Sequence, residues 1–236
     1  MTSWTIDPPS PRARRAPPPK HVDGDARTSA SHPITVSWVL GDEIACEQAT
    51  PGGVGGVDLP GRLGLCYCPG KNLVRDGITW RRNVVEDATR LRSHHGVNTV
   101  VCLVSDRELR ALGVEPRCYA DALARAGMEA IRYEVDEMAA PPSVDCAMDL
   151  LDDVVCCLLR RGDRVVFHCR GGVGRAGTLA ACARLLAGRE RTAADAIAAV
   201  RKRRCRTAVE SRRQEAFVAE FASALEAAGG GGWEGD

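Results

Sequence analysis

A single cysteine and two arginines lie in a glycine-rich turn whose spacing suits phosphate chemistry. Residues 168–178 read HCRGGVGRAGT, with five residues between Cys169 and Arg175. The glycines let the backbone curl so that successive N–H groups can point inward and bind an anion. Such a positively charged cup favours the thiolate of Cys169 over the thiol, which makes it a nucleophile at neutral pH.

The predicted phosphate-binding site is this turn together with the helix that follows it. The helix is expected to begin near Arg175 and to aim the positive end of its dipole at the anion. The Arg175 side chain can reach over the turn and bind two phosphate oxygens. The residues predicted to bind phosphate are Arg170, Gly171, Gly172, Val173, Gly174 and Arg175.

The motif HCRGGVGRAGT resembles the signature of cysteine-dependent protein phosphatases and matches their dual-specificity class. Rhodanese-like domains have a shorter loop, and low-molecular-weight phosphatases and arsenate reductases place theirs near the N-terminus. The resemblance extends from LPGRLGLCYCPGK (59–71) to TAVESRRQEAFVAEF (207–221). Within the protein tyrosine phosphatase superfamily it is strongest to the cyclin-dependent-kinase-associated phosphatase branch. It implies a phosphocysteine intermediate hydrolysed by water, with neither a metal nor a cofactor.

The same resemblance implies an acid that protonates the leaving group and further residues that support the loop. Asp136, after a predicted strand and before a Pro-Pro turn, is the predicted acid, and Glu137 and Asp145 are its rivals. Gln214 matches a late glutamine of the family that orients the hydrolytic water. His168 is expected to hold the loop by hydrogen bonding.

One position departs from the pattern of many relatives. They carry Ser or Thr after the loop arginine, where a hydroxyl helps the thiolate leave, whereas this chain has Ala176. We therefore expect slow hydrolysis of the intermediate. Thr178 supplies the nearest hydroxyl.

Cys102, on a strand expected beside the active-site strand, is a candidate redox partner of Cys169, and a packed core thiol is the alternative.

Composition excludes several other classes of protein. The chain has 236 residues, of which 44% are hydrophobic and 27% charged, and its 32 basic and 31 acidic residues leave a net charge of +1. Such a balance does not suit a nucleic-acid binder. No apolar run is long enough to span a membrane and no signal peptide is visible, so we expect a cytoplasmic protein. The 11 cysteines lack zinc-like spacing and are predicted to be mostly core thiols.

Strand and helix patterns alternate along the chain, which predicts an α/β fold with a central, mainly parallel twisted sheet flanked by helices, as in dual-specificity phosphatases. Strands are expected at 33–39, 63–68, 97–104, 128–135 and 163–168. Helices are expected after Asn83, Ser105, Ser143, Thr192 and Thr207, and from Pro116. Glu86 and Glu108 would complete capping boxes. Ligands then bind beyond the carboxyl ends of the strands.

The expected organisation is a Pro/Arg-rich disordered arm (1–32), a phosphatase domain (33–228) and a flexible glycine-rich tail (229–236). The leading function is hydrolysis of phosphotyrosine, phosphoserine or phosphothreonine in proteins, with a protein kinase as one conceivable partner and neither nucleic acid nor membrane as a partner. The alternatives are a phosphoinositide or RNA 5′-phosphatase and a weakly catalytic phosphoprotein-binding module. Arg170 as the only additional base inside the loop argues against a lipid substrate.

Overall fold

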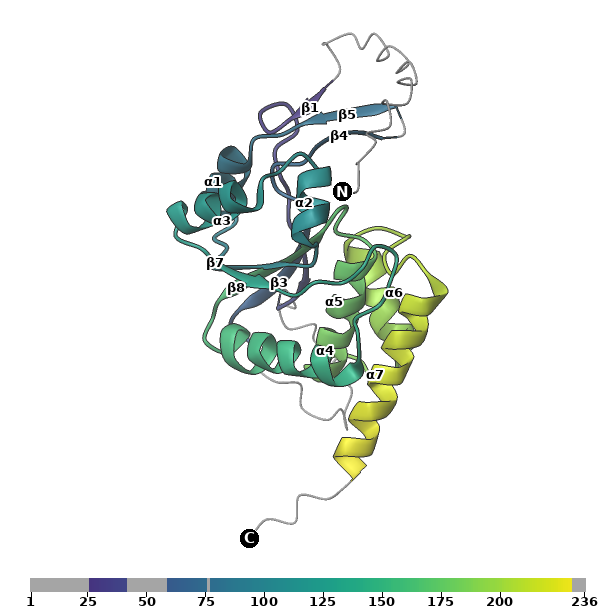
Figure 1. Ribbon diagram of the computed structural model, residues 1–236. Coiled ribbons are helices and arrows are strands. Elements are labelled where there is room, and N and C mark those ends of the chain that lie inside the picture. The colour runs from purple at the N-terminus through teal and green to yellow at the C-terminus, as the bar shows by residue number, and fades with distance from the viewer. Residues whose placement is uncertain (1–25, 42–58, 76, 231–236) are drawn as a thin grey trace, which may run out of the picture.

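A computed structural model describes residues 26–41, 59–75 and 77–230, which form a five-stranded sheet, a three-stranded sheet and seven α-helices (Figure 1). The strands are β1 (Arg27–Thr28), β2 (Ser37–Leu40), β3 (Arg62–Tyr67), β4 (Asn72–Arg75), β5 (Ile78–Arg81), β6 (Thr99–Cys102), β7 (Glu129–Arg132) and β8 (Arg164–Cys169). The helices are α1 (Val84–Ser93), α2 (Asp106–Ala111), α3 (Pro116–Arg125), α4 (Val144–Leu151), α5 (Arg175–Leu186), α6 (Ala193–Arg203) and α7 (Arg212–Gly230). A π-helical segment, Asp152–Leu159, continues α4.

The larger sheet has the strand order β2-β3-β8-β6-β7 and is parallel except for β2 at its edge. This confirms the predicted α/β class with a mainly parallel sheet. The central strand β8 is apolar at Val165, Val166 and Phe167, all fully buried, because helices cover both faces of a parallel sheet. The end of β8 therefore lies at the centre of the carboxyl edge.

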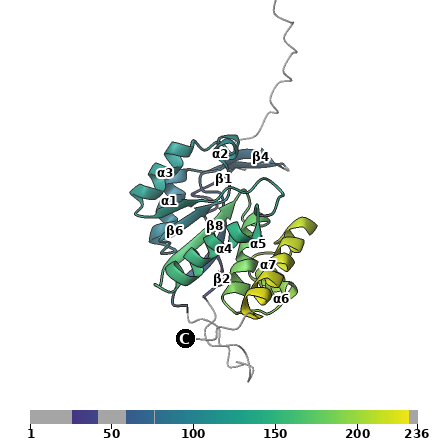
Figure 2. The ribbon, with the colours of Figure 1, turned by 60° about the horizontal axis from the view of Figure 1, so that its bottom comes forward.

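Helices lie on both faces of this sheet (Figures 1 and 2). Helices α1 and α3 pack together on one face, whereas α4, α5, α6 and α7 form a layer on the other. Helix α5 is the centre of that second layer, because α6 and α7 both pack against it and nearly all its residues are buried. The helix that follows the glycine-rich turn is thus fixed in place along most of its length.

The smaller sheet was not predicted from the sequence. It has the order β1-β5-β4, with β4 and β5 forming an antiparallel hairpin whose turn includes Gly77. A buried ion pair anchors its base, because the Arg82 guanidinium donates to both carboxylate oxygens of Asp87 at 2.6 and 2.8 Å. Asp87 also accepts from the Gly70 backbone N–H at 2.9 Å. The hairpin is therefore held firmly against α1.

Most predicted helix starts are confirmed by side-chain caps. Asn83, Ser105, Ser143 and Thr192 each accept a hydrogen bond from a backbone N–H in the first turn of their helix. The predicted start after Thr207 is wrong. The chain instead takes a left-handed φ of 60° at Val209, which a right-handed helix cannot contain, and α7 begins only at Arg212.

The predicted limits of the arm and the tail need correction where the structure describes them. Residues 26–32, assigned to the arm, include β1, which pairs in parallel with β5. At the other end α7 runs to Gly230, past the predicted boundary at 228. The remainder of the arm, 1–25, and the end of the tail, 231–236, lie outside the described residues.

Two expectations about the cysteines and the membrane can be compared with the described part of the chain. The prediction of mostly core thiols is confirmed for half of the ten cysteines among the described residues: Cys66, Cys68, Cys102, Cys169 and Cys182 are buried, whereas Cys118, Cys146, Cys156 and Cys157 are exposed and Cys205 is partly exposed. No helix among residues 26–41, 59–75 and 77–230 is both long and apolar enough to cross a membrane.

Candidate active site

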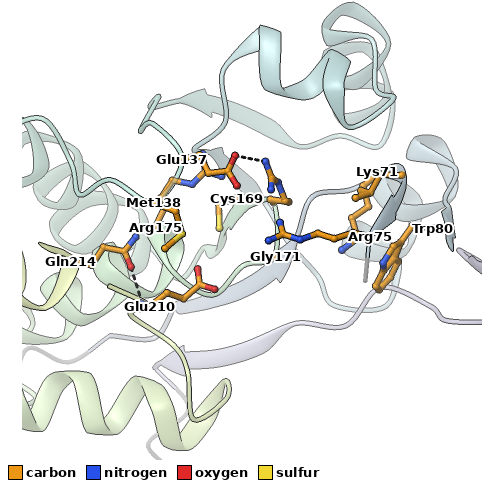
Figure 3. A pocket seen from close by; sticks show the side chains of 12 residues that line it. Lys71, Arg75, Trp80, Glu137, Met138, Cys169, Gly171, Arg175, Glu210 and Gln214 are labelled. Carbon is orange, nitrogen blue, oxygen red and sulfur yellow. Dashed lines mark hydrogen bonds and ion pairs between the residues drawn. The ribbon is translucent and has the colours of Figure 1, made fainter. Parts of the chain in front are cut away.

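The glycine-rich turn joins the end of β8 to the start of α5, as the sequence predicted. Cys169 is the last residue of β8, pairs in register with Tyr67 of β3 and is only 3% exposed. Arg175 is the first residue of α5. The two residues line one cavity of about 230 Å³ that opens at the carboxyl edge of the sheet (Figure 3). The predicted nucleophile and the predicted phosphate-binding arginine are thereby brought together.

The carbonyl groups of the turn all bond outward to the scaffold. Every carbonyl from position 170 to 174 accepts a hydrogen bond, in the pairs Cys68 N to Arg170 O, Arg204 Nη2 to Gly171 O, Arg204 Nε to Gly172 O, Val209 N to Val173 O and Thr178 N to Gly174 O. No acceptor among the described residues takes the N–H groups of these five residues. Backbone N–H groups away from water need acceptors. The turn therefore presents unbonded N–H donors suited to an anion.

One of the glycines is required by close approach. Gly172 has a left-handed φ of 64°, and a Cβ there would come within 2.0 Å of the Cys66 carbonyl oxygen and push the loop away from β3. A Cβ on Gly174 would come within 2.3 Å of the end of the Glu210 side chain and 3.0 Å of the Gln214 amide, so these side chains would have to shift.

Glu108 of α2 orients Arg175. Its two carboxylate oxygens accept from Nη1 and Nη2 of Arg175, each at 2.7 Å, and the Val135 carbonyl accepts from Nη1 at 2.8 Å. Of the five guanidinium hydrogens, this leaves those on Nε and on the adjacent side of Nη2. They form the second fork of the group, free to bind two phosphate oxygens.

The sequence assigned Glu108 to a capping box, and this is wrong. Ser105 does cap α2 by accepting from the Glu108 N–H at 3.2 Å, but the Glu108 side chain is committed to Arg175. An ion pair with a nearly buried guanidinium outcompetes a cap at an exposed helix end. Its role was missed because Glu108 and Arg175 are 67 positions apart in the sequence.

Arg204 is a second residue that the sequence did not reveal. It follows α6 and donates to two loop carbonyls, of Gly171 and Gly172, at 2.9 Å each. By drawing these carbonyls outward, it turns the N–H groups of the following residues toward the cavity. An arginine near a helix C-terminus has many uses, so only the folded chain identifies this one.

The predicted acid lies on the expected loop, after β7 and before the Pro-Pro turn, but its side chain does not line the cavity that holds Cys169. Asp136 is exposed and lines two neighbouring hollows, not the cavity that holds Cys169. Its rival Glu137 does line that cavity, where it pairs with Arg170 at 2.5 Å. The turn that carries both also contains Met138, at a left-handed φ of 61°. The other rival, Asp145, lies in the first turn of α4 and lines a separate hollow.

Gln214 is buried and ties the acid turn to helix α7. Its amide nitrogen donates to the Ala139 carbonyl at 3.0 Å, and its oxygen accepts from the N–H groups of Glu210 and Ser211. One amide hydrogen is left over, and the side chain lines the cavity. The structure thus brings Gln214 to the site with one donor available for a water molecule.

His168 is fully buried below the loop. The Tyr119 hydroxyl and His168 Nε2 are 2.6 Å apart, and burial lowers the pKa of His168 to about 3. Burial also raises the pKa of Tyr119 well above its usual range, so the phenol donates and Nε2 accepts. Nδ1 then carries the hydrogen and faces the Cys169 carbonyl at 3.4 Å. This neutral imidazole holds the backbone of the nucleophile, as predicted for a loop-supporting histidine.

The remaining predicted residues lie nearby but are already engaged. The Thr178 hydroxyl donates to the Gly174 carbonyl at 2.9 Å, so it does not substitute for the hydroxyl missing at Ala176, which is fully buried. Cys102 lies on β6 beside β8, as expected, in register with His168. Its sulfur accepts from Arg132 at 3.0 Å.

The opposite wall of the cavity comes from the β4–β5 hairpin, which the sequence did not connect with the site. Lys71, Leu73, Arg75 and Trp80 line this wall (Figure 3). Their contribution depends on a hairpin about 100 positions before Cys169, so no local pattern around the motif could have indicated it. Among the described residues, no cluster of three or more His, Cys, Asp or Glu side chains could hold a metal ion.

Comparisons with known proteins agree on one kind of protein. The family described as "Polymorphic toxin system, DSP-PTPase phosphatase" matches residues 76–189, just under half of the chain. Proteins named "Cyclin-dependent kinase inhibitor 3" from Rattus norvegicus and Homo sapiens are each 26% identical over 195 residues, which is 83% of this chain and 82% of theirs.

Solved structures show the same fold. Kinase associated phosphatase with its catalytic cysteine changed to serine matches with a TM-score of 0.66 and 24% identity, over 83% of this chain and 97% of that one. PTPMT1 in complex with PI(5)P matches with a TM-score of 0.55 and 20% identity, over 70% of this chain and 93% of that one.

Proposed function

We propose that this chain, a cysteine-dependent phosphatase of the dual-specificity type similar to kinase-associated phosphatase, hydrolyses phosphotyrosine, phosphoserine or phosphothreonine in proteins. The observation that carries the proposal is the loop whose carbonyls all bond outward, which leaves its N–H groups for a phosphoryl group beside Cys169. Arg175 adds a free guanidinium fork on the same cavity.

The proposed reaction has two steps. In the first, the Cys169 thiolate attacks phosphorus, an S–P bond forms, and the ester P–O bond breaks as the leaving oxygen takes a proton from an acid. In the second, water attacks phosphorus, the S–P bond breaks, and inorganic phosphate leaves. The loop N–H groups and the free fork of Arg175 bind the equatorial oxygens most strongly when their charge is greatest. The proposed second step uses the remaining amide hydrogen of Gln214 to orient the water.

A generic aryl phosphate assay tests catalysis by Cys169. Wild type is expected to hydrolyse the substrate and Cys169→Ser to lose activity by at least about a thousandfold, because an alcohol is not ionised at neutral pH. Activity in neither protein, together with tight binding of a phosphopeptide to both, would instead establish a phosphoprotein-binding module. Undiminished activity in Cys169→Ser would contradict the proposed mechanism.

For the acid we propose Asp136. Glu137 faces the cavity but is ion-paired with Arg170, so it would have to leave that contact to donate a proton. Asp136 is exposed on the same turn and makes no ion pair with another described residue. Asp136 lies outside the cavity, so the proposal requires the turn to move, and Met138, two residues later with a left-handed φ of 61°, is a strained point of that turn.

Two variants distinguish these carboxylates. Asp136→Asn is expected to lower kcat on a phosphotyrosine peptide by about a hundredfold or more, the usual contribution of a general acid. It should have much less effect on an aryl phosphate whose leaving group needs no proton. The matched variant Glu137→Gln should change both rates little. If Glu137→Gln produced the substrate-dependent loss, Glu137 would be the acid.

The names of the relatives suggest where a substrate would be found. They are described as a cyclin-dependent kinase inhibitor and a kinase-associated phosphatase, so a phosphorylated protein kinase is our first candidate substrate. We also propose a cytoplasmic location, because the ten cysteines among the described residues are all free thiols, as is usual in a reducing compartment. Copurification of a kinase with Asp136→Asn, but not with the same variant carrying Cys169→Ala, would support this substrate class.

A further inference from the structure

Lys71 is a buried cation that faces the catalytic cavity. It lies between β3 and β4, lines the same cavity as Cys169, and its exposed fraction is 7%. Its ammonium group lies 3.7 Å from the centre of the Trp80 ring and 4.6 Å from that of Tyr67. These two rings stabilise the cation through their faces. Figure 3 shows Lys71, Arg75 and Trp80 on the side of the cavity opposite Glu210.

No carboxylate among residues 26–41, 59–75 and 77–230 forms an ion pair or hydrogen bond with Lys71. The Cys169 thiolate in the same cavity favours its charged form without such a contact. The two arginines of the loop are paired, Arg175 with Glu108 and Arg170 with Glu137. A charged group that has lost its water needs a partner, and burial lowers the pKa of Lys71 to about 8. The rings offset only part of this cost.

The position of Lys71 is fixed before any ligand arrives. The Lys71 carbonyl accepts from the Arg82 N–H at 3.3 Å, and Arg82 is held by the buried ion pair with Asp87. Asn72, the next residue, bonds through its N–H to the Leu112 carbonyl at 2.6 Å. A cation on so rigid a base is pre-organised for a partner of defined position.

The scissile phosphate does not account for this cation. Five loop N–H groups and the free fork of Arg175 already surround one phosphoryl group. A cavity of about 230 Å³ has room for more than that group. Lys71 and Arg75 lie on the hairpin wall of this space, and the loop carries neither of them.

We propose that Lys71, with Arg75 beside it, binds a second phosphate on the substrate, so that the enzyme prefers a peptide phosphorylated at two nearby residues. This inference rests on the proposed phosphatase function and names its substrate class more closely. Side chains of alternate residues in an extended peptide point the same way, ~7 Å apart. One phosphate can then lie over Cys169 and the other on the hairpin wall.

A peptide fits the surroundings better than a membrane lipid. Leu73, Trp80 and Met138 supply apolar surface around the cavity, suited to the side chains between two phosphates. The chain as a whole carries a net charge of only +1, with 32 basic and 31 acidic residues. A surface that binds anionic lipid usually gathers many basic residues.

The test compares three synthetic substrates on the full-length protein. They are a phosphotyrosine peptide, the same peptide with a second phosphate two residues away, and soluble inositol bisphosphate. For wild type we expect kcat/KM to be about tenfold higher on the doubly phosphorylated peptide, as one added charge-assisted contact would give. In Lys71→Met, which keeps the apolar packing against Trp80, this ratio should fall to about one. Lys202→Met, at an exposed lysine of α6, is the matched control and should keep the wild-type ratio.

Each other outcome overturns the inference in a recognisable way. Equal kcat/KM of wild type on both peptides removes the second site, and this measurement does not depend on any variant folding. An equal fractional loss on both peptides in Lys71→Met would place Lys71 at the scissile phosphate instead. Preference for inositol bisphosphate over both peptides would replace the peptide with a lipid headgroup. Absence of any activity on an aryl phosphate would instead defeat the proposed phosphatase function itself.

Discussion

Arg175 and Lys71 face one cavity from opposite walls. They differ in the groups that compensate their positive charge. The loop wall is fully bonded: Glu108 and Val135 hold Arg175, and each outward carbonyl of the loop has a donor. On the hairpin wall the Lys71 ammonium group lies against the Trp80 and Tyr67 rings and pairs with no carboxylate of the described residues. The loop wall is thus built for a group that every substrate shares, the scissile phosphate. The hairpin wall leaves the Lys71 ammonium group available for a second phosphate, which only some substrates carry.

This difference predicts that changes to the loop wall affect all substrates. Arg175→Lys should lower kcat by about a hundred- to a thousandfold on singly and doubly phosphorylated peptides alike, because a lysine cannot present the planar fork. Steady-state kinetics on both peptides measure this loss. Arg170→Lys, in the same loop but at a side chain paired with Glu137, should lower kcat much less. A loss confined to the doubly phosphorylated peptide would contradict the division between the two walls.

A smaller loss on all substrates is expected from the residue that positions Arg175. Glu108→Gln removes the charge that holds the guanidinium, and kcat should fall about tenfold, or ~1.4 kcal/mol, with little change in KM. Rate measurements and thermal unfolding should be made together. Glu108→Asp should recover part of kcat if orientation is the cause. Destabilisation with an unchanged kcat in the folded fraction would leave Glu108 a merely structural role.

The preference for the doubly phosphorylated peptide, which the hairpin wall provides, should depend on pH. Burial, together with the nearby cations Arg82 and Arg204, lowers the pKa of Lys71 to about 8, and Cys68 and Cys169 oppose this shift when ionised. Lys71 is charged below that pH and loses its proton above it. The preference for the doubly phosphorylated peptide should therefore be full near pH 7 and fade by pH 9.

The matched variant for this profile is Lys71→Arg, since arginine keeps its charge throughout. Its preference, whatever its size at pH 7, should persist at pH 9. The ratio of kcat/KM on the two peptides, measured from pH 6.5 to 9, gives the profile. An identical decline in wild type and Lys71→Arg would show that another group titrates.

The smallest expected effect is at Ala176. Ala176→Ser would restore a hydroxyl next to Cys169 and should speed hydrolysis of the phosphocysteine about three- to fivefold, the worth of one hydrogen bond. A stopped-flow experiment would show a smaller burst and a faster steady state. Thr178→Val is the control, because that hydroxyl is bonded to the Gly174 carbonyl. An unchanged burst in Ala176→Ser would reject the idea that hydrolysis is limited by the missing donor.

Patterns within about ten residues sufficed to predict most of the larger sheet and its helices. Asn83, Ser143 and Thr192 cap their helices because a cap bonds to an N–H two or three residues later. The hairpin β4–β5 was missed because its short strands are partly exposed and lack a strong apolar alternation. The start of α7 was misplaced because Thr207 and Glu210 also fit a capping pattern.

The same limit of range explains the outcome at the active site. Cys169, Arg175 and the loop glycines lie in one short segment, so their chemistry could be inferred from it. Asp136 and Glu137 are adjacent, so the sequence does not indicate which of them faces the cavity, whereas in the folded chain Glu137 lines it. From the sequence, Arg170 was the only basic residue expected at the site besides Arg175, whereas Lys71 and Arg75 also line the cavity.

The amino-acid sequence by itself determined the α/β class and was enough to predict the nucleophile and the phosphate-binding turn, because strand, turn and helix are consecutive there and each obeys local rules. Only the tertiary structure decided which distant side chains surround that turn. Glu108, Arg204 and Lys71 reach it from three separate elements, and electrostatic contacts of this kind depend on distance in space, which the order of residues along the chain does not specify.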